Sequence, residues 1–288
     1  MTEKTIQRVP QTGIKALNNM LNTDTMKKKF ADMLGKKSVG FLSSISNIVT
    51  NNDLLQKADI NSIVLAAAQA AALDLPITPN LGFSAIIPFN DNKKSQCLAQ
   101  FQIMRDGWVE LAMRTGQVVS LVNEIVYEGE LVKRNRFRDE YEFDETQRKS
   151  DKVIGFMAYI RLNNGFEKTV FMTVEEAREH GLKYSKTLKK GYGLWKDDFN
   201  SMALKTVLKR LIKKYCPKSI DMQRALVSDQ ATFNGDVNDP DNAQPIYADN
   251  QTIDVPAHEV QEVNPEEVPI VDVAVAPTQA AQPIEEDF

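Results

Sequence analysis

The stretch LWKDDFNSMALKTVLKRLIKKYCP at residues 194–217 predicts a long amphipathic helix that the rest of the fold must cover. At 100° per residue, its apolar and basic side chains separate into two arcs. The apolar arc contains Leu204, Val207, Leu208, Leu211, Ile212 and Tyr215. The opposite arc contains Lys205, Lys209, Arg210, Lys213 and Lys214. Because Pro217 cannot continue a helix, we predict a helix over about residues 194–215 with one core face and one cationic face.

Hairpin signals before this helix predict antiparallel β-structure. The apolar runs GFSAIIPFN (82–90) and CLAQFQI (97–103) flank a polar turn and are predicted to pair. The runs KVIGFMAYIRL (152–162) and FEKTVFMT (166–173) are joined by Asn-Asn-Gly, which accepts the positive φ of a tight turn. A brief helix over residues 174–180, ended by Gly181, is predicted to follow the second hairpin. Together with the long helix, these elements predict an α+β fold.

Additional helices are predicted nearer the N-terminus. Apolar side chains recur at helical spacing within residues 26–34. A second helix, over about residues 61–73, is rich in small side chains and is capped by Asp59 or Asn61. Residues 1–25 are polar and weakly patterned, so we predict a flexible N-terminal segment there.

The net charge of −4 combines a basic body with an acidic tail. Residues 229–288 contain 14 Asp and Glu and no Lys or Arg, which leaves 35 basic against 25 acidic residues in the rest of the chain. The tail has too little apolar material to offset the entropy of ordering. We therefore predict a core at 26–228 and a disordered acidic tail at 229–288. A basic body favours a polyanion-binding module, although an ordinary domain with a biased tail has the same charge pattern.

Composition also bears on location and on several classes of site. Two isolated cysteines, Cys97 and Cys216, fit a reducing compartment and form neither a disulfide framework nor a zinc module. His180 and His258 are too few for a His-based metal site. The chain has no secretory signal and no apolar run of the roughly 18–20 residues that a membrane span requires, so we expect a cytoplasmic protein without a membrane partner. Its one Gly-Lys dipeptide lacks the upstream glycine of a phosphate-binding loop, so no ATP site is expected.

The densest basic segment has the composition of a single-strand groove. Between Lys183 and Lys218 there are 11 Lys or Arg and two acids, interleaved with Tyr and Trp. Cationic groups can follow phosphates while aromatic faces stack bases. The alternative is a solvated helix face, and for Trp195 and Phe199 we favour core packing over base stacking. The candidate DNA-binding residues are Arg105, Arg114, Lys186, Lys189, Lys190, Tyr192, Lys205, Lys209, Arg210, Lys213 and Lys214.

The acidic run RDEYEFDE at residues 138–145 raises a different possibility. Paired carboxylates can hold Mg²⁺ for phosphodiester cleavage, which would make the protein a nuclease. Alternating charged and aromatic residues are instead typical of a strand with one exposed face. We favour the exposed strand.

Four segments resemble the RecT family of phage and prophage single-strand annealing proteins over roughly residues 30–220. They are LDLPITPNLGFSAIIPF, QFQIMRDGWVELAMRTGQV, GFMAYIRLNNGFEKTVFMTVEEAREH and LWKDDFNSMALKTVLKRLIKKYCP. The last is the most specific, because the family shows a Trp, an acid, Met-Ala-x-Lys-Thr, a basic pair and a closing Pro. The matching positions are Trp195, Asp198, Met202-Ala203, Lys205-Thr206, Lys209-Arg210 and Pro217. Asp106 departs from the pattern, since many relatives carry Lys or Arg there, and this argues against a phosphate contact at that position.

The resemblance implies properties beyond those derived from spacing. It implies a curved antiparallel sheet crossed by the long helix, and ATP-independent pairing of complementary DNA strands without a cofactor or catalysis. It also implies homo-oligomeric rings or helical filaments that hold a first strand and stabilise the new duplex. A partner 5′→3′ exonuclease and the host single-strand-binding protein are expected. A passive single-strand-binding protein and a metal-dependent nuclease remain the alternatives.

The acidic tail allows three interpretations. It is a tether that recruits partner proteins, a brake that competes with DNA for the basic residues, or inert disorder.

Overall fold

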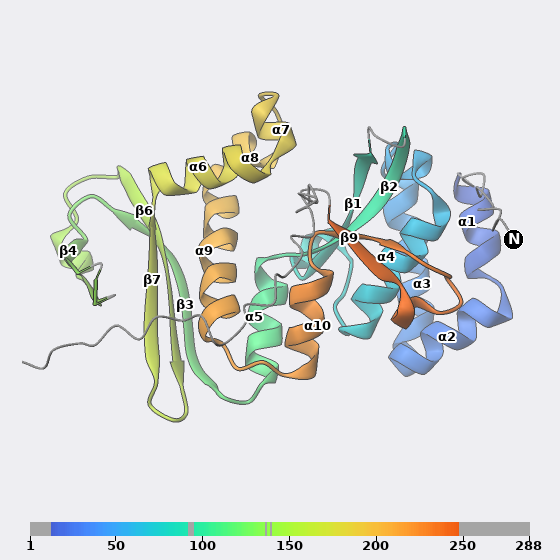
Figure 1. Ribbon diagram of the computed structural model, residues 1–288, viewed down its shortest axis with the longest axis horizontal. Coiled ribbons are helices and arrows are strands. Elements are labelled where there is room, and N and C mark those ends of the chain that lie inside the picture. Colours follow the sequence, from blue (N-terminus) through green and yellow to red (C-terminus); the bar gives the residue numbers. More distant parts are fainter. Residues whose placement is uncertain (1–12, 92–94, 136, 139, 248–288) are drawn as a thin grey trace, which may run out of the picture. The chain divides into compact units, whose positions relative to one another are not determined.

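The computed structural model describes residues 13–91, 95–135, 137–138 and 140–247. Within these residues the chain is α+β, with antiparallel sheets and helices packed on them, as predicted (Figure 1). The strands form a four-stranded, a three-stranded and a two-stranded sheet, whereas the resemblance implied one curved sheet.

The N-terminal part is helical from its first described turns. The elements are α1 (Ile14–Leu21), α2 (Asp24–Leu34), η1 (Gly35–Lys37), α3 (Ser38–Thr50), η2 (Leu55–Lys57), α4 (Ile60–Ala72) and η3 (Pro79–Leu81). The prediction of a flexible segment at 1–25 is therefore wrong for residues 14–25, while residues 1–12 lie outside the described chain. Leu17 and Leu21 are buried one turn apart, and this burial holds α1 against α3.

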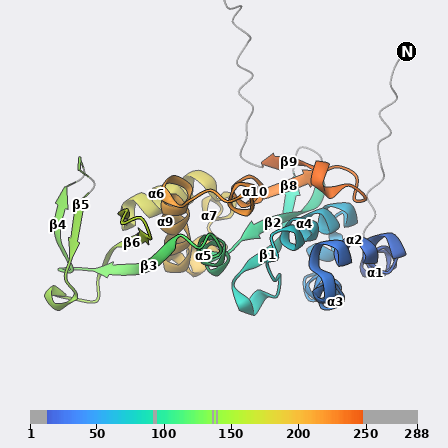
Figure 2. The same cartoon turned by 90° about the horizontal axis from the view of Figure 1, so that it is seen from below.

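Helix α4 is the buried centre of this part. Its N-cap Asp59 accepts a hydrogen bond from the Ser62 backbone N at 3.1 Å, which confirms one of the two predicted caps. Almost the whole helix is buried, because small side chains let neighbours approach it from several sides. Helix α4 contacts the four-stranded sheet and α2, and Figure 2 shows it between the sheet and the other N-terminal helices.

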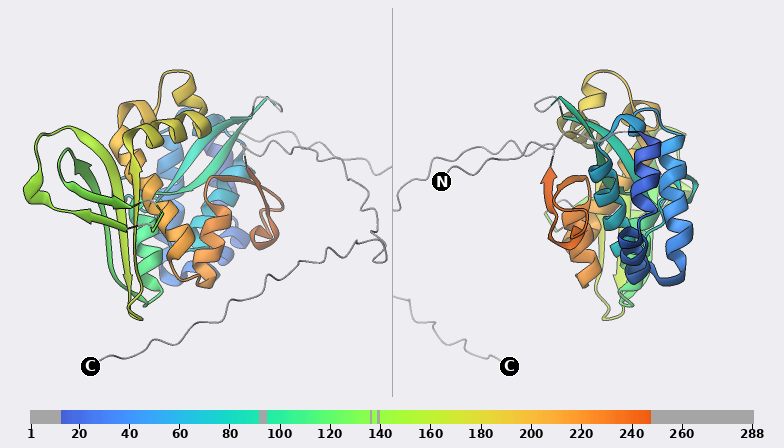
Figure 3. Two further views of the ribbon diagram at one scale, coloured as in Figure 1. Left: turned by 60° about the vertical axis from the view of Figure 1, so that its left-hand side comes forward. Right: turned by 90° about the vertical axis from the view of Figure 1, so that its right-hand side faces the viewer.

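The four-stranded sheet pairs a hairpin within residues 84–103 with the C-terminal end of the described chain. Strands β1 (Ser84–Asp91) and β2 (Gln96–Ile103) form the predicted hairpin. Strands β8 (Ala231–Asn234) and β9 (Gln244–Tyr247), separated by η5 (Pro240–Asn242), complete the order β1-β2-β8-β9. Figure 3 shows this orange C-terminal segment next to the teal hairpin. The predicted boundary at residue 228 is therefore too early, and the ordered core reaches Tyr247. The prediction rested on the average composition of residues 229–288, which does not show that the few residues of β8 are buried against β2 and α4.

The three-stranded sheet carries the second predicted hairpin. Strands β3 (Val118–Tyr127), β6 (Val153–Leu162) and β7 (Glu167–Thr173) pair in the order β3-β6-β7. Gly165 in the β6–β7 turn has φ 86°, as the Asn-Asn-Gly sequence predicts. The two-stranded sheet, β4 (Leu131–Asn135) and β5 (Glu140–Phe143), precedes η4 (Glu145–Gln147). Strand β5 alternates exposed Glu with partly buried Tyr and Phe, as the favoured interpretation of this acidic run predicts.

The remaining helices surround the long amphipathic helix. They are α5 (Arg105–Arg114), α6 (Val174–Tyr184), α7 (Lys186–Lys189), α8 (Leu194–Asp197), α9 (Phe199–Tyr215) and α10 (Ile220–Ser228). Helix α9 contacts all three strands of the β3-β6-β7 sheet, and α5 lies on its other side (Figure 1). The predicted core face is confirmed, because Leu204, Val207, Leu208, Leu211 and Ile212 are buried.

Two helix boundaries differ from the prediction. The continuous helix over 194–215 is interrupted at Asp198, whose side chain caps α9 by accepting a hydrogen bond from Ser201 N at 3.3 Å. Helix α6 continues through Gly181 to Tyr184 instead of ending at Gly181. A Cβ at Gly181 would lie 2.8 Å from the Trp195 ring, so this glycine permits close packing and does not end the helix. Trp195 is 9% exposed and packs on Phe199, as the core interpretation predicted.

Candidate nucleic-acid interface

Four of the predicted DNA-binding residues form an exposed group at α7. Lys186, Lys189, Lys190 and Tyr192 are all exposed, Tyr192 by 55%, and we call them the α7 cluster. The Lys186 Nζ lies 5.1 Å from the centre of the Phe89 ring, which places α7 beside strand β1. The cluster therefore adjoins the first hairpin as well as α8.

The backbone of the α7 cluster is held by specific contacts. The N-cap Ser185 accepts a hydrogen bond from Leu188 N at 3.1 Å, and Tyr192 N donates to Thr187 O at 3.1 Å. Gly193 has φ 93°, and a Cβ there would lie 2.7 Å from Thr187 Oγ1. The turn thus requires glycine for its shape.

The exposed cations of α9 form a second group. Lys213 and Lys214 lie in its last turn, and the Lys214 Nζ is 5.0 Å from the Tyr215 ring centre. At 1.5 Å per residue, they are about 20 Å along the axis from the start of α9. Arg210 is exposed too, and its Nη2 lies 3.3 Å from His180 Nδ1 on α6. The basic side chains of α9 therefore do not form the single cationic face that their spacing predicted, because Arg210 lies against α6 whereas Lys213 and Lys214 lie at the end of the helix.

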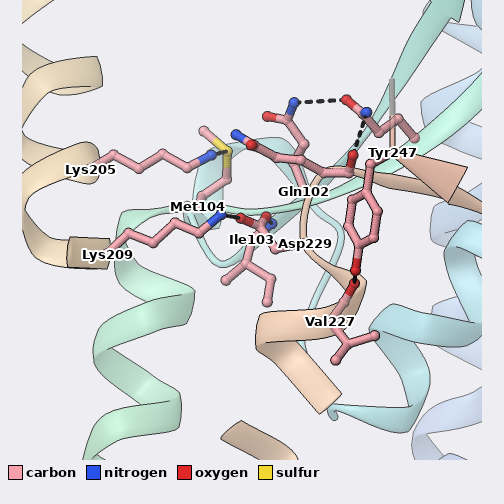
Figure 4. Close-up of polar contacts among 10 residues, drawn as sticks. Gln102, Ile103, Met104, Lys205, Lys209, Val227, Asp229 and Tyr247 are labelled. Carbon is pink, nitrogen blue, oxygen red and sulfur yellow. Dashed lines mark hydrogen bonds and ion pairs between the residues drawn. The ribbon is translucent and has the colours of Figure 1, made fainter. Parts of the chain in front are cut away.

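Lys205 and Lys209 do not lie on an exposed face, which corrects the prediction. Lys205 is 5% exposed, and its Nζ donates to the sulfur of Met104 at 3.6 Å. Lys209 forms an ion pair with Asp229, and its Nζ lies 5.6 Å from the Trp108 ring centre (Figure 4). The physical reason is that α9 is covered on two sides, since α5 packs on the arc opposite the sheet. A helical wheel gives the direction of a side chain but not whether a second layer covers it.

Asp229 was predicted to begin the acidic tail, but it is instead a buried residue that pairs with Lys209 of α9. Its side chain is 0% exposed, and it accepts a hydrogen bond from Ile103 N at 2.7 Å. The next residue, Gln230, has φ 64°, and its N donates to Phe101 O at 2.9 Å. This left-handed turn between α10 and β8 holds the carboxylate inside, facing α9. The sequence signal for a buried Asp229 is only indirect: lysines on a covered helix require a counter-charge, but nothing in the sequence shows which acid supplies it.

Arg114 and Arg105 make their contacts elsewhere, with residues outside the α7 cluster and outside α9. Arg114 donates to Leu73 O at 2.7 Å and to Asp74 O at 3.0 Å, so its guanidinium satisfies carbonyls at the end of α4. It also pairs with Glu110 at 2.9 Å. Arg105 is exposed at the start of α5 and pairs with the neighbouring Asp106 at 3.0 Å.

Burial shifts the titration of three basic groups around α9. Burial lowers the pKa of Lys205, while the nearby Asp229 carboxylate opposes that shift and Lys209 adds to it. Burial also lowers the pKa of Lys218, whose Nζ donates to Ile212 O and Cys216 O at the end of α9. The pKa of His180 is lowered to about 4 by burial, with further contributions from Arg210, Lys209 and Lys183.

The lowered pKa of His180 predicts a specific loss of stability in acid. In the unfolded chain a histidine titrates near pH 6.5, so between about pH 6.5 and 4 the unfolded state binds more protons than the folded one. Stability should therefore fall as the pH falls through this window, and less steeply in a His180→Gln variant. Urea unfolding of both proteins at a series of pH values measures the difference. Parallel stability curves would contradict the prediction.

Two negative findings concern the described residues only. No group of three or more His, Cys, Asp or Glu side chains suited to holding a metal ion is found among them. Within the same residues, every helix is too short or too polar to traverse a lipid bilayer.

Comparison with known proteins connects this arrangement to a family. A sequence model described as the RecT family matches residues 40–245. The chain belongs to the RecT family. The match ends two residues before Tyr247, so it includes β8 and the first two residues of β9 as well as the α7 cluster and α9. The predicted resemblance is thereby confirmed over residues 40–220, and the match extends it to residue 245.

Two relatives give the degree of similarity to other RecT-family chains. The chain is 40% identical over 224 residues to the uncharacterized protein YqaK of Bacillus subtilis (strain 168), covering 78% of this chain and 75% of that protein. It is 29% identical over 224 residues to Protein RecT of Escherichia coli (strain K12), covering 74% of this chain and 79% of that protein.

Proposed function

We propose that this protein binds single-stranded DNA and anneals complementary strands during homologous recombination, without ATP, a cofactor or a catalytic step. The observation that carries the proposal is the RecT family match over residues 40–245, which contains all the candidate DNA-binding residues. The exposed α7 cluster and the cations of α9 support it, because their chemistry suits a flexible polyanion.

Annealing assisted by these exposed cations requires no nucleotide hydrolysis. Annealing is downhill, since stacking contributes on average about 1.4 kcal/mol per base-pair step. What slows it is the repulsion between two polyanions and the search for register. Cations that neutralise a first strand lower that repulsion and release counterions, so binding should weaken steeply with salt.

The candidate residues take different roles in this proposal. Lysines of the α7 cluster, with Arg210, Lys213 and Lys214, contact phosphates, and the Tyr192 ring stacks on a base. Lys209 also contacts DNA, although only 27% of its side chain is exposed. Arg114 and Lys205 act through the fold, because their charged groups already lie against carbonyls and a sulfur atom.

Assembly and partners extend the proposal. The protein acts as a homo-oligomeric ring or helical filament that holds a first strand open to a second and stabilises the product duplex. A 5′→3′ exonuclease exposes that strand, and the host single-strand-binding protein is displaced or recruited, all in the cytoplasm. Residues 248–288, which remain acidic, form a tether for such partners or a brake on DNA binding.

Sequential mixing of two complementary dye-labelled oligonucleotides with excess EDTA and no nucleotide tests the proposal. We expect pairing at least tenfold faster than without protein, and intact strands on a denaturing gel. Tight binding without acceleration would instead identify a passive single-strand-binding protein. Strand loss only after Mg²⁺ replaces EDTA would identify a nuclease.

A further inference from the structure

The Asp229 carboxylate faces two ammonium groups from the same face of α9. Lys209 is bonded to it directly, and Lys205, one helical turn earlier, is close enough for the carboxylate charge to act on its titration. On its other side Asp229 accepts the hydrogen bond from Ile103 N. Figure 4 shows both lysines reaching from α9 toward the Ile103–Met104 segment and Asp229.

The two lysines differ in their access to solvent. Lys209 has 27% of its side chain exposed, whereas Lys205 as a residue is 5% exposed. The hydrogen bond described for the Lys205 ammonium is to the sulfur of Met104, which is a weak acceptor. Burying an ammonium group with so weak an acceptor is unfavourable, so packing alone does not account for a lysine at this position.

One carboxylate with two cations has a surplus positive charge. If Lys209 leaves Asp229 for another anion, a buried and uncompensated carboxylate would ordinarily remain, which is strongly destabilising. Here Lys205 remains inside, and its ammonium has donors beyond the one that meets the Met104 sulfur. Because an ammonium is a flexible point charge on a four-carbon stem, Lys205 can turn toward the carboxylate and replace Lys209.

We propose that Lys205 is the reserve counter-charge of Asp229, which allows Lys209 to transfer from this internal carboxylate to a phosphate of bound DNA. The proposal rests on the proposed function, because the phosphate belongs to single-stranded DNA. Lys205 is thus a positioning residue that acts on DNA through Lys209 without touching it. Asp229 is an internal anion with which the strand competes.

The first test measures redundancy in the free protein and needs no DNA. Lys205→Met and Lys209→Met should each change the unfolding equilibrium constant by less than about tenfold, since one lysine still faces Asp229. The double variant should raise that constant by about a thousandfold, because the carboxylate is then buried without a partner. Adding Asp229→Asn should restore most of the loss. Single-variant effects that simply add would overturn the shared role, and Lys205→Gln provides a second neutral form if Lys205→Met does not fold.

The second test measures binding of the full chain to a fluorescent dT oligonucleotide. Lys205→Met should weaken binding by about tenfold although its side chain is buried, because Lys209 is then confined to Asp229. Asp229→Asn should tighten binding, and the Lys205→Met/Asp229→Asn double variant should bind at least as tightly as the wild type. The matched control is Lys213→Met on the same helix, which should weaken binding and not be rescued by Asp229→Asn.

The outcomes separate this proposal from the proposed function. A wild-type protein that does not bind the oligonucleotide at low salt contradicts the proposed function, while the unfolding test still decides the pairing of charges. A wild type that binds, with Lys205→Met binding equally well, overturns the transfer of Lys209 alone. A Lys205→Met defect that Asp229→Asn fails to rescue would mean that Lys205 contacts DNA directly.

Discussion

Replacing Lys186, Lys189 and Lys190 with alanine is expected to weaken binding to single-stranded DNA on the order of a hundredfold near physiological salt, with the fold intact. All three side chains are exposed on one turn of helix and its cap, so their loss leaves no cavity and no buried charge. Each phosphate contact on a single strand contributes about 0.7 to the dependence of log K on log salt. The slope should therefore fall by about 2 in the triple variant. Fluorescence anisotropy with a labelled oligonucleotide at several salt concentrations measures both quantities.

The matched control removes the same charge elsewhere. Lys27, Lys28 and Lys36 are exposed in α2 and η1 of the N-terminal helical part. Their replacement by alanine should change affinity by only a few-fold and leave the slope nearly unchanged. Equal losses in the two triple variants would mean that net charge alone attracts DNA and that the α7 cluster has no special role.

The second large effect is expected from Gly107→Ala in α5, which should destabilise the protein by about 3 kcal/mol or more. Helix propensity alone favours alanine over glycine by about 1 kcal/mol. A Cβ at Gly107, however, would lie 2.0 Å from the carbonyl oxygen of Phe83 and 2.9 Å from Ile103 Cγ2. The backbone oxygen can move only if α5 separates from the start of β1, so the steric term is larger than the propensity term. Chemical denaturation of both proteins gives the difference.

Gly40→Ala provides the control for this argument. Gly40 lies within α3, it is exposed, and a Cβ there meets no atom within 4 Å. The same substitution should therefore stabilise the protein by about 1 kcal/mol, since only helix propensity acts. A destabilised Gly40→Ala, or a Gly107→Ala of unchanged stability, would contradict the steric explanation.

The parts of the fold that sequence predicted well are those specified by local chemistry. The β6–β7 turn follows from Asn-Asn-Gly, the start of α4 from Asp59, and the core face of α9 from leucine spacing. Strands β8 and β9 were missed because each has four residues, and the partner of β8 in β2 is 130 positions away along the chain. Four residues give no usable periodicity, so only the position of β2 specifies their conformation.

The candidate site was predicted in part for a related reason. The exposure of the α7 cluster follows from a loop with many lysines and almost no acids. The burial of Lys205 and Lys209 depends on α5 and on Asp229, which composition placed in the acidic tail. Pairing between α9 and the turn after α10 is a tertiary property, and a single sequence contains no periodic signal for it.

The pairing of β8 with β2 has a consequence for how the chain acquires its structure. The hydrogen-bonding edge of β2 forms early along the chain, but it is not covered until residue 231 is available. During synthesis the first hairpin therefore remains without its partner β8 until the whole β3–α10 region has emerged. Contacts of such high sequence separation slow folding and leave an unpaired strand edge open to other chains. We expect the nascent protein to depend on chaperones or on rapid folding of the α9 region, and refolding yield to fall steeply with protein concentration.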